Sequence, residues 1–109
     1  MTVRVRLAAL ADLEEGRGVR VEVRGHRIAL FSIEDTVYAI GDRCSHAEAS
    51  LAEGEVWEGA VECPRHGSAF DLATGLPESF PATRPVAVYQ LEIADGDVFT
   101  TLEPVEEES

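Results

Sequence analysis

Apolar and polar residues alternate with a period of two along much of this chain, and helical periodicity is scarce. At positions 19–23 valines alternate with charged residues, which is typical of a strand with one buried face. Further short strands are predicted at residues 28–33, 37–40, 55–57, 60–63, 69–72, 86–93 and 97–102. Only residues 8–14, and the segment after position 46, could hold a short helix. Many short strands at regular spacing predict an antiparallel all-β sandwich or barrel.

Turn residues separate the predicted strands. Asp95-Gly96 indicates a hairpin turn, because glycine tolerates the positive φ that such a turn needs. Gly25 indicates an earlier turn, and we expect His26, next to it, to be a surface histidine of that hairpin. Trp57 lies in the strand predicted at residues 55–57, and we expect it in the core of that hairpin.

The chain is strongly acidic, with 21 Asp and Glu against 9 Lys and Arg and a formal net charge of −12. This charge repels nucleic-acid phosphates and anionic membrane surfaces, so we expect neither as a partner. It either favours a basic patch on a protein partner or serves only for solubility. We expect residues 1–103 to form a single domain and residues 104–109 to form an acidic, mobile tail.

The expected compartment is the cytoplasm. Residues 1–6 alternate apolar and basic side chains without the continuous apolar run of a signal peptide. No stretch has the length and apolar character of a transmembrane helix. The two cysteines both lie in motifs suited to metal binding, which requires reduced thiols.

Two short motifs contain both cysteines and two of the three histidines. The first has the form C-x-H, with Cys44 and His46, and the second has the form C-x-x-H, with Cys63 and His66. Two thiolates and two imidazoles form a complete ligand set for a metal centre. Rieske [2Fe–2S] centres use such a set, with two cysteines on one iron and two histidines on the other.

Zinc is the main alternative for the same four ligands. A Cys₂His₂ zinc finger places both cysteines in one turn and both histidines on a following helix. Here each motif mixes a cysteine with a histidine, and the residues between the motifs do not predict a helix that could present histidines. A third reading, in which these residues bind no metal, leaves their paired spacing unexplained.

Residues 63–71, Cys-Pro-Arg-His-Gly-Ser-Ala-Phe-Asp, resemble the second cluster loop of Rieske proteins, and residues 41–46 resemble the first. Residues 81–85 are similar to the proline-rich loop that shields the cluster in that family. The resemblance implies a Rieske-like antiparallel β-sandwich with a small cluster-binding subdomain formed by two loops. It implies one Rieske-type [2Fe–2S] cluster per chain, held by Cys44, His46, Cys63 and His66.

The chain also departs from the Rieske proteins of respiratory and photosynthetic complexes. Those proteins carry two further cysteines that bridge their cluster loops, whereas this chain has Ala49 and Arg65 at the matching positions. Ser68 matches a serine that bonds a bridging sulfide, but Phe70 replaces a tyrosine that bonds a cysteine sulfur. Because hydrogen bonds to the cluster tune its potential, this pattern predicts a potential low to intermediate within the Rieske range.

Four apolar residues next to the motifs are candidates for a collar that keeps water from the cluster. They are Leu51, Pro64, Phe70 and Pro81.

The pattern resembles the soluble ferredoxins that serve ring-hydroxylating dioxygenases. This implies a one-electron carrier without catalytic residues, with an NAD(P)H-dependent flavin reductase as donor and a terminal oxygenase or other redox protein as acceptor. Two alternatives are a ferredoxin of iron–sulfur cluster biogenesis and the Rieske-fold small subunit of an assimilatory nitrite reductase. The chain contains no Ser-His-Asp motif, glycine-rich phosphate loop or dinucleotide fingerprint.

Overall fold

The computed structural model describes residues 2–43, 49–64, 68–78 and 84–103. Cys44, His46, Arg65, His66, Pro81 and the expected tail at 104–109 lie outside the described residues.

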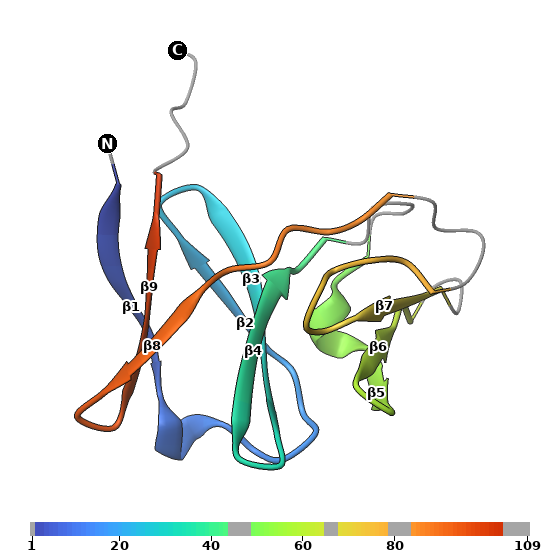
Figure 1. Ribbon diagram of the computed structural model, residues 1–109, viewed down its shortest axis with the longest axis horizontal. Helices are drawn as coiled ribbons and strands as arrows, with labels where there is room; N and C mark the ends of the chain where they lie inside the picture. Colours follow the sequence, from blue (N-terminus) through green and yellow to red (C-terminus); the bar gives the residue numbers. More distant parts are fainter. Residues whose placement is uncertain (1, 44–48, 65–67, 79–83, 104–109) are drawn as a thin grey trace.

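Within the described residues, nine strands form three antiparallel sheets of three strands each (Figure 1). The first sheet contains β1 (Val3–Ala9), β9 (Asp97–Leu102) and β8 (Leu91–Ala94), in that order. The second contains β2 (Val19–Val23), β3 (His26–Ile33) and β4 (Thr36–Gly41). The third contains β5 (Glu55–Trp57), β6 (Ala60–Glu62) and β7 (Ala69–Asp71), and lies to one side of the other two. The predicted all-β antiparallel class is confirmed.

Strand β3 separates two hydrophobic cores. Its residues 28–31 are all buried, and because successive side chains point to opposite faces, they alternate between the two cores. Ile28 and Leu30 pack with residues of the first sheet, whereas Ala29 and Phe31 pack with residues of the small third sheet. One strand therefore joins the body of the protein to the subdomain that carries the second motif.

Helical structure in the described part of the chain is limited to two 3-10 turns, η1 (Leu10–Asp12) and η2 (Leu51–Glu53). The helix expected at residues 8–14 is thus reduced to η1, because β1 continues to Ala9 and pairs with β9. The short helix considered after His46 corresponds to η2.

The strand expected at residues 86–93 is partly wrong, since regular pairing begins only at Leu91. Residues 86–90 instead run beside β4 as an irregular extended segment. They are held by an isolated bridge between Val88 and Ile40 and by two backbone hydrogen bonds, Gly41 N–H to Ala87 at 2.8 Å and Tyr89 N–H to Ala39 at 2.9 Å. This segment crosses from the subdomain back to the first sheet, so it cannot stay in register with either sheet (Figure 1).

The predicted hairpin turn at Asp95-Gly96 is confirmed, with φ of 52° and 80° at its two residues. As expected, His26 lies in the β2–β3 hairpin and is partly exposed. His26 is the first residue of β3, and both of its ring nitrogens are engaged, Nδ1 with the Tyr89 hydroxyl at 2.9 Å and Nε2 with the Glu103 carbonyl at 2.6 Å. A carbonyl only accepts, so Nε2 carries a proton and donates it to Glu103.

Trp57 does not lie in the core, contrary to expectation: it is 76% exposed. Strand β5 alternates, with Val56 packed against the core and Glu55 and Trp57 on the outer face. The period of two in this strand could have placed Trp57 outside.

Candidate metal centre

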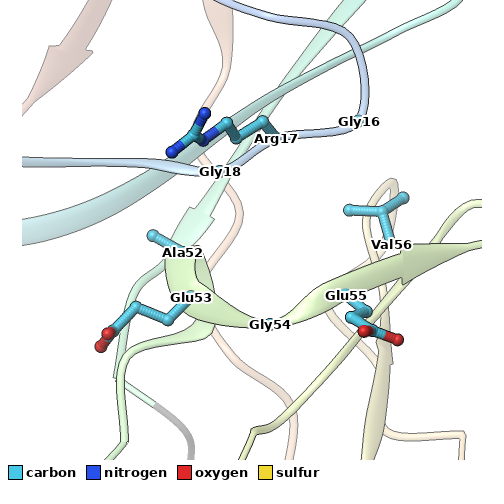
Figure 2. A pocket seen from close by; sticks show the side chains of 8 residues that line it. All are labelled: Gly16, Arg17, Gly18, Ala52, Glu53, Gly54, Glu55 and Val56. Atoms are coloured by element: carbon cyan, nitrogen blue, oxygen red, sulfur yellow. The ribbon is translucent and has the colours of Figure 1, made fainter.

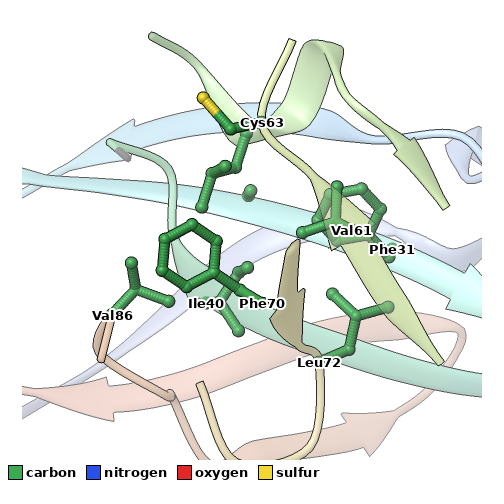
Figure 3. Close-up of a cluster of buried hydrophobic side chains, with 9 residues drawn as sticks. Phe31, Ile40, Val61, Cys63, Phe70, Leu72 and Val86 are labelled. Carbon is green, nitrogen blue, oxygen red and sulfur yellow. The ribbon is translucent and has the colours of Figure 1, made fainter. Parts of the chain in front are cut away.

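Cys63, of the second motif, lies directly after β6 and is fully buried. Its backbone N–H donates to the Ser68 carbonyl at 2.6 Å, and Glu62 pairs with Ala69 across β6 and β7. The chain that leaves at Cys63 therefore returns at Ser68, which is also buried. Figure 3 shows Cys63 at the edge of the hydrophobic cluster, with its sulfur pointing away from the labelled apolar side chains. A buried free thiol at the base of a short loop is well placed to ligate a metal.

The segment that contains the first motif also has a paired base. Arg43 forms an antiparallel bridge with Ser50, and the Leu51 N–H donates to the Asp42 carbonyl at 2.6 Å. Leu51 belongs to the same buried cluster as Cys63. One hydrophobic core thus supports the ends of both motif-bearing segments.

The side chain of Asp42 stabilises the base of the segment that contains the first motif through hydrogen bonds. Its Oδ1 accepts from the Ser50 hydroxyl at 2.7 Å and from the Ala52 N–H at 2.9 Å, while Arg27 Nη2 lies 3.4 Å from Oδ2. The carboxylate is fully buried, and a buried charge is tolerated only when it is paired and hydrogen-bonded. Arg27 Nε is buried and has no hydrogen-bond partner within the described ranges, so the Arg27 contact is the weaker part of this network.

Sequence reasoning overlooked Asp42 as a functional residue. The sequence signal for it was an acidic residue two positions before a predicted ligand cysteine and eight before a serine. A lone sequence cannot distinguish that arrangement from a solvated loop aspartate.

Two of the four residues expected to form the apolar collar lie in the buried cluster that contains Cys63. Leu51 and Phe70 are fully buried and pack in one cluster with Cys63. Pro64 is exposed, because it lies in the turn after β6, and Pro81 is outside the described residues. The remaining buried members of the cluster are Ala29, Phe31, Ile40, Val61, Leu72 and Val86.

The turn that follows β7 also stabilises the subdomain that carries the second motif. Asp71 ends β7, and its Oδ1 accepts from the N–H groups of Ala73 and Thr74 at 2.8 and 2.9 Å. Gly75 follows with a φ of 74°, and a Cβ there would lie 2.3 Å from the Val86 carbonyl oxygen. Only glycine fits this contact, which draws the extended segment from Val86 onward against the subdomain.

Of the four predicted ligands, only Cys63 lies within the described ranges, and those ranges contain no group of three or more His, Cys, Asp or Glu that could hold a metal ion. The residues present nevertheless fit an iron–sulfur cluster. Cys63 offers a buried thiol, and the apolar cluster beneath it, which includes Phe70, excludes water from that side. Ala49, at the position of one extra cysteine in the high-potential proteins, packs against the same core and cannot form a disulfide.

A separate pocket of about 600 Å³ lies between residues 16–18 and the segment from η2 into β5 (Figure 2). Three of its eight lining residues, Gly16, Gly18 and Gly54, contribute no side chains. Its basic residue, Arg17, forms an exposed ion pair with Glu14 at 3.2 Å. The residues that line this pocket do not form a nucleophile–base pair or a metal-ligand set.

No helix in the described part of the chain is long and apolar enough to cross a membrane.

Comparisons with known proteins agree with this architecture. The profile of the Rieske [2Fe-2S] domain family matches residues 3–90. The 3-phenylpropionate/cinnamic acid dioxygenase ferredoxin subunit of Escherichia coli (strain K12) is 41% identical over 100 residues, covering 91% of this chain and 93% of that protein.

Two solved structures extend the comparison. A chain in the complex of reduced oxygenase and oxidized ferredoxin in carbazole 1,9a-dioxygenase matches with a TM-score of 0.86 and 36% identity, over 96% of this chain and 98% of that one. A putative NADH-dependent nitrite reductase small subunit from Mycobacterium tuberculosis matches with a TM-score of 0.84 and 27% identity, over 96% and 99% of the two chains.

The all-β fold and the family match over residues 3–90 together define an iron–sulfur protein of the Rieske type. The chain belongs to the Rieske [2Fe-2S] domain family, whose cofactor is a [2Fe-2S] cluster. Within that family it is similar to ferredoxin subunits of ring-hydroxylating dioxygenases.

Proposed function

We propose that this protein is a one-electron carrier that receives electrons from an NAD(P)H-dependent flavin reductase and delivers them to a terminal oxygenase of the aromatic-ring dioxygenase type. The similarity to the Escherichia coli ferredoxin subunit over nine-tenths of both chains is the observation that carries this proposal. The match to a chain of a ferredoxin–oxygenase complex supports the choice of acceptor.

Cys44 and Cys63 would hold one iron, and His46 and His66 would hold the other. The bound cluster would accept and release one electron at a time. With four protein ligands on two irons, no coordination position stays open for a substrate, so the protein would carry electrons and catalyse no reaction itself. The cytoplasm suits this role, because a reduced thiol pool keeps both cysteines available.

The described residues support the cluster in two ways. Leu51 and Phe70, packed with Cys63, exclude water from the inner side of the site, which helps to set the potential. Asp42 fixes the base of the segment that carries Cys44 and His46 through its bonds to Ser50 and Ala52. The described ends of both motif-bearing segments thereby meet one hydrophobic core.

Anaerobic mixing of the dithionite-reduced protein with a purified, oxidised aromatic-ring dioxygenase tests the acceptor. We expect reoxidation of the cluster, seen in visible absorption, with matching reduction of the oxygenase. Failure to reduce such oxygenases would overturn the proposed acceptor.

The similarity to a nitrite reductase small subunit makes that enzyme the second candidate. The catalytic subunit of an assimilatory nitrite reductase therefore serves as the comparison protein in the same experiment. Formation of a stable complex with that subunit, without electron transfer to an oxygenase, would favour the second candidate.

A further inference from the structure

Trp57 is the large hydrophobic residue that stands out most from the surface of the described chain. It is 76% exposed at the end of β5, on the outer face of the β5–β6 hairpin. Tryptophan side chains are well buried on average. Tryptophan is also enriched among the interface residues that contribute most of the binding energy. Its position therefore raises the question of what covers it.

Trp57 borders a groove of about 500 Å³ between two hairpins. The β3–β4 hairpin contributes Ile33, Glu34 and Tyr38 to one wall, and the β5–β6 hairpin contributes Trp57 and Glu58 to the other. Apolar and aromatic surfaces thus line the groove from both sides.

Every charged residue that lines the groove is acidic: Glu15, Glu34 and Glu58. None of the three forms an ion pair with another described residue. Both carboxylate oxygens of Glu15 lie 3.0 Å from the Glu34 N–H, which fixes that carboxylate at the rim. The groove therefore combines an exposed indole with a fixed negative rim, the two features that attract a cation with an apolar flank.

We propose that this groove binds a segment of a protein partner that presents an arginine or lysine flanked by apolar side chains. The cation would lie over the Trp57 ring among the three carboxylates, and the apolar flank would cover Ile33 and Tyr38. A second copy of this chain does not fit, because its own net charge is −12. Nucleic acid is excluded by the same negative charge.

The groove is separate from the metal centre. Trp57 pairs with Ala60 at one end of the β5–β6 ladder, and Cys63 follows the other end of β6, roughly 10 Å away at about 3.3 Å per residue. A partner anchored at Trp57 would leave the cysteine end of the subdomain accessible. The groove is therefore an anchoring site additional to any contact made at the cluster, and it does not depend on the proposed electron acceptor.

Trp57 offers a direct readout, because it is the chain's one tryptophan and its indole N–H gives one signal in a ¹⁵N NMR spectrum. The probe is a synthetic peptide with two arginines flanked by leucines, added to the ¹⁵N-labelled holoprotein. We expect saturable shifts of the indole signal and of the backbone amides of Thr36 and Gly59, weakened by added salt. A peptide with glutamates in place of the arginines should produce none.

Trp57→Ala and Glu58→Gln should each weaken peptide binding, the former by about tenfold or more, as followed by the Gly59 amide. Ile93→Ala is the matched control, because Ile93 is 48% exposed on β8, in another sheet. Both groove positions are exposed, and unchanged amide signals from β9 would show that the variants keep their fold.

The proposal is overturned if millimolar peptide leaves the indole signal in place, if the glutamate peptide binds equally, or if Trp57→Ala binds as tightly as Ile93→Ala. The experiment involves no electron transfer. Failure of the oxygenase assay and failure of the groove proposal are therefore distinguishable.

Discussion

Asp42→Asn tests the claim that a buried carboxylate holds the base of the first motif. The substitution keeps the size of the side chain but removes its charge and one of its two acceptor atoms. The remaining amide oxygen can still accept from Ser50 and Ala52, now without the strengthening that a negative charge provides. The amide nitrogen, as a donor, would face the guanidinium of Arg27 or take the place of the acceptor toward Ser50.

The expected loss follows from these contacts. Weakening two charge-assisted hydrogen bonds removes about 1 kcal/mol each, and losing the pairing with Arg27 adds about 1–2 kcal/mol. Removing the charge also relieves the cost of burying an ionised carboxylate, which offsets part of the loss. We therefore expect a net destabilisation of about 2–3 kcal/mol.

The assay is urea-induced loss of the cluster's visible absorption, measured on the holoprotein. With a urea dependence of about 1–1.5 kcal/mol per M for a chain of this size, the midpoint of Asp42→Asn should fall by about 2 M. Asp12→Asn, at an exposed position in η1, is the matched control and should move the midpoint by less than about 0.5 M. Equal midpoints for the two variants would refute the anchoring role of Asp42.

Three further predictions concern the core and the metal centre. Gly18→Ala should destabilise the protein by about 1–3 kcal/mol, because its Cβ would lie 2.3 Å from the Ala52 carbonyl oxygen. Gly41→Ala is the control, since its Cβ would meet only ordinary contacts from 3.6 Å. Equal urea midpoints for the two variants would contradict this prediction. Burial raises the pKa of Tyr89, so the unfolded chain loses this proton first and the free energy of unfolding should fall as the pH rises above about 10. In Tyr89→Phe the part of this fall that comes from Tyr89 should be missing. Identical pH profiles of the unfolding free energy for the variant and the wild type would contradict this prediction. Cys63→Ser should lower the bound iron and sulfide at least severalfold, and wild-type contents in that variant would exclude Cys63 as a ligand.

Much of the fold was predictable because short-range physics determines it. Partly buried and exposed side chains alternate along β2, as expected for a strand with one buried face. The turn at Asp95-Gly96 requires residues that tolerate a positive φ. The continuous apolar run in β3 also fits its burial on both faces. These signals lie within a few residues of one another, so one sequence suffices to show them.

The errors arose where distant parts of the chain decide the outcome. Residues 86–90 look like a strand, but their place beside β4 follows from the crossing between two sheets. The hydrogen bonds of His26 could not be predicted for the same reason, because Tyr89 and Glu103 are more than sixty positions away. The buried role of Asp42 depends in the same way on Arg27 from β3. Motif spacing predicted the metal ligands, but three of the four lie outside the described residues, so that assignment stays a prediction.

The measurement that tests the central claim most directly is pulsed EPR on the dithionite-reduced protein labelled with ¹⁵N-histidine, with iron, zinc and sulfide quantified on the same sample. We expect two irons and two sulfides per chain, as a [2Fe-2S] cluster requires, and hyperfine coupling to two histidine nitrogens that falls to one in His46→Cys or His66→Cys. Stoichiometric zinc in place of iron, or a cluster without histidine coupling, would contradict the assignment.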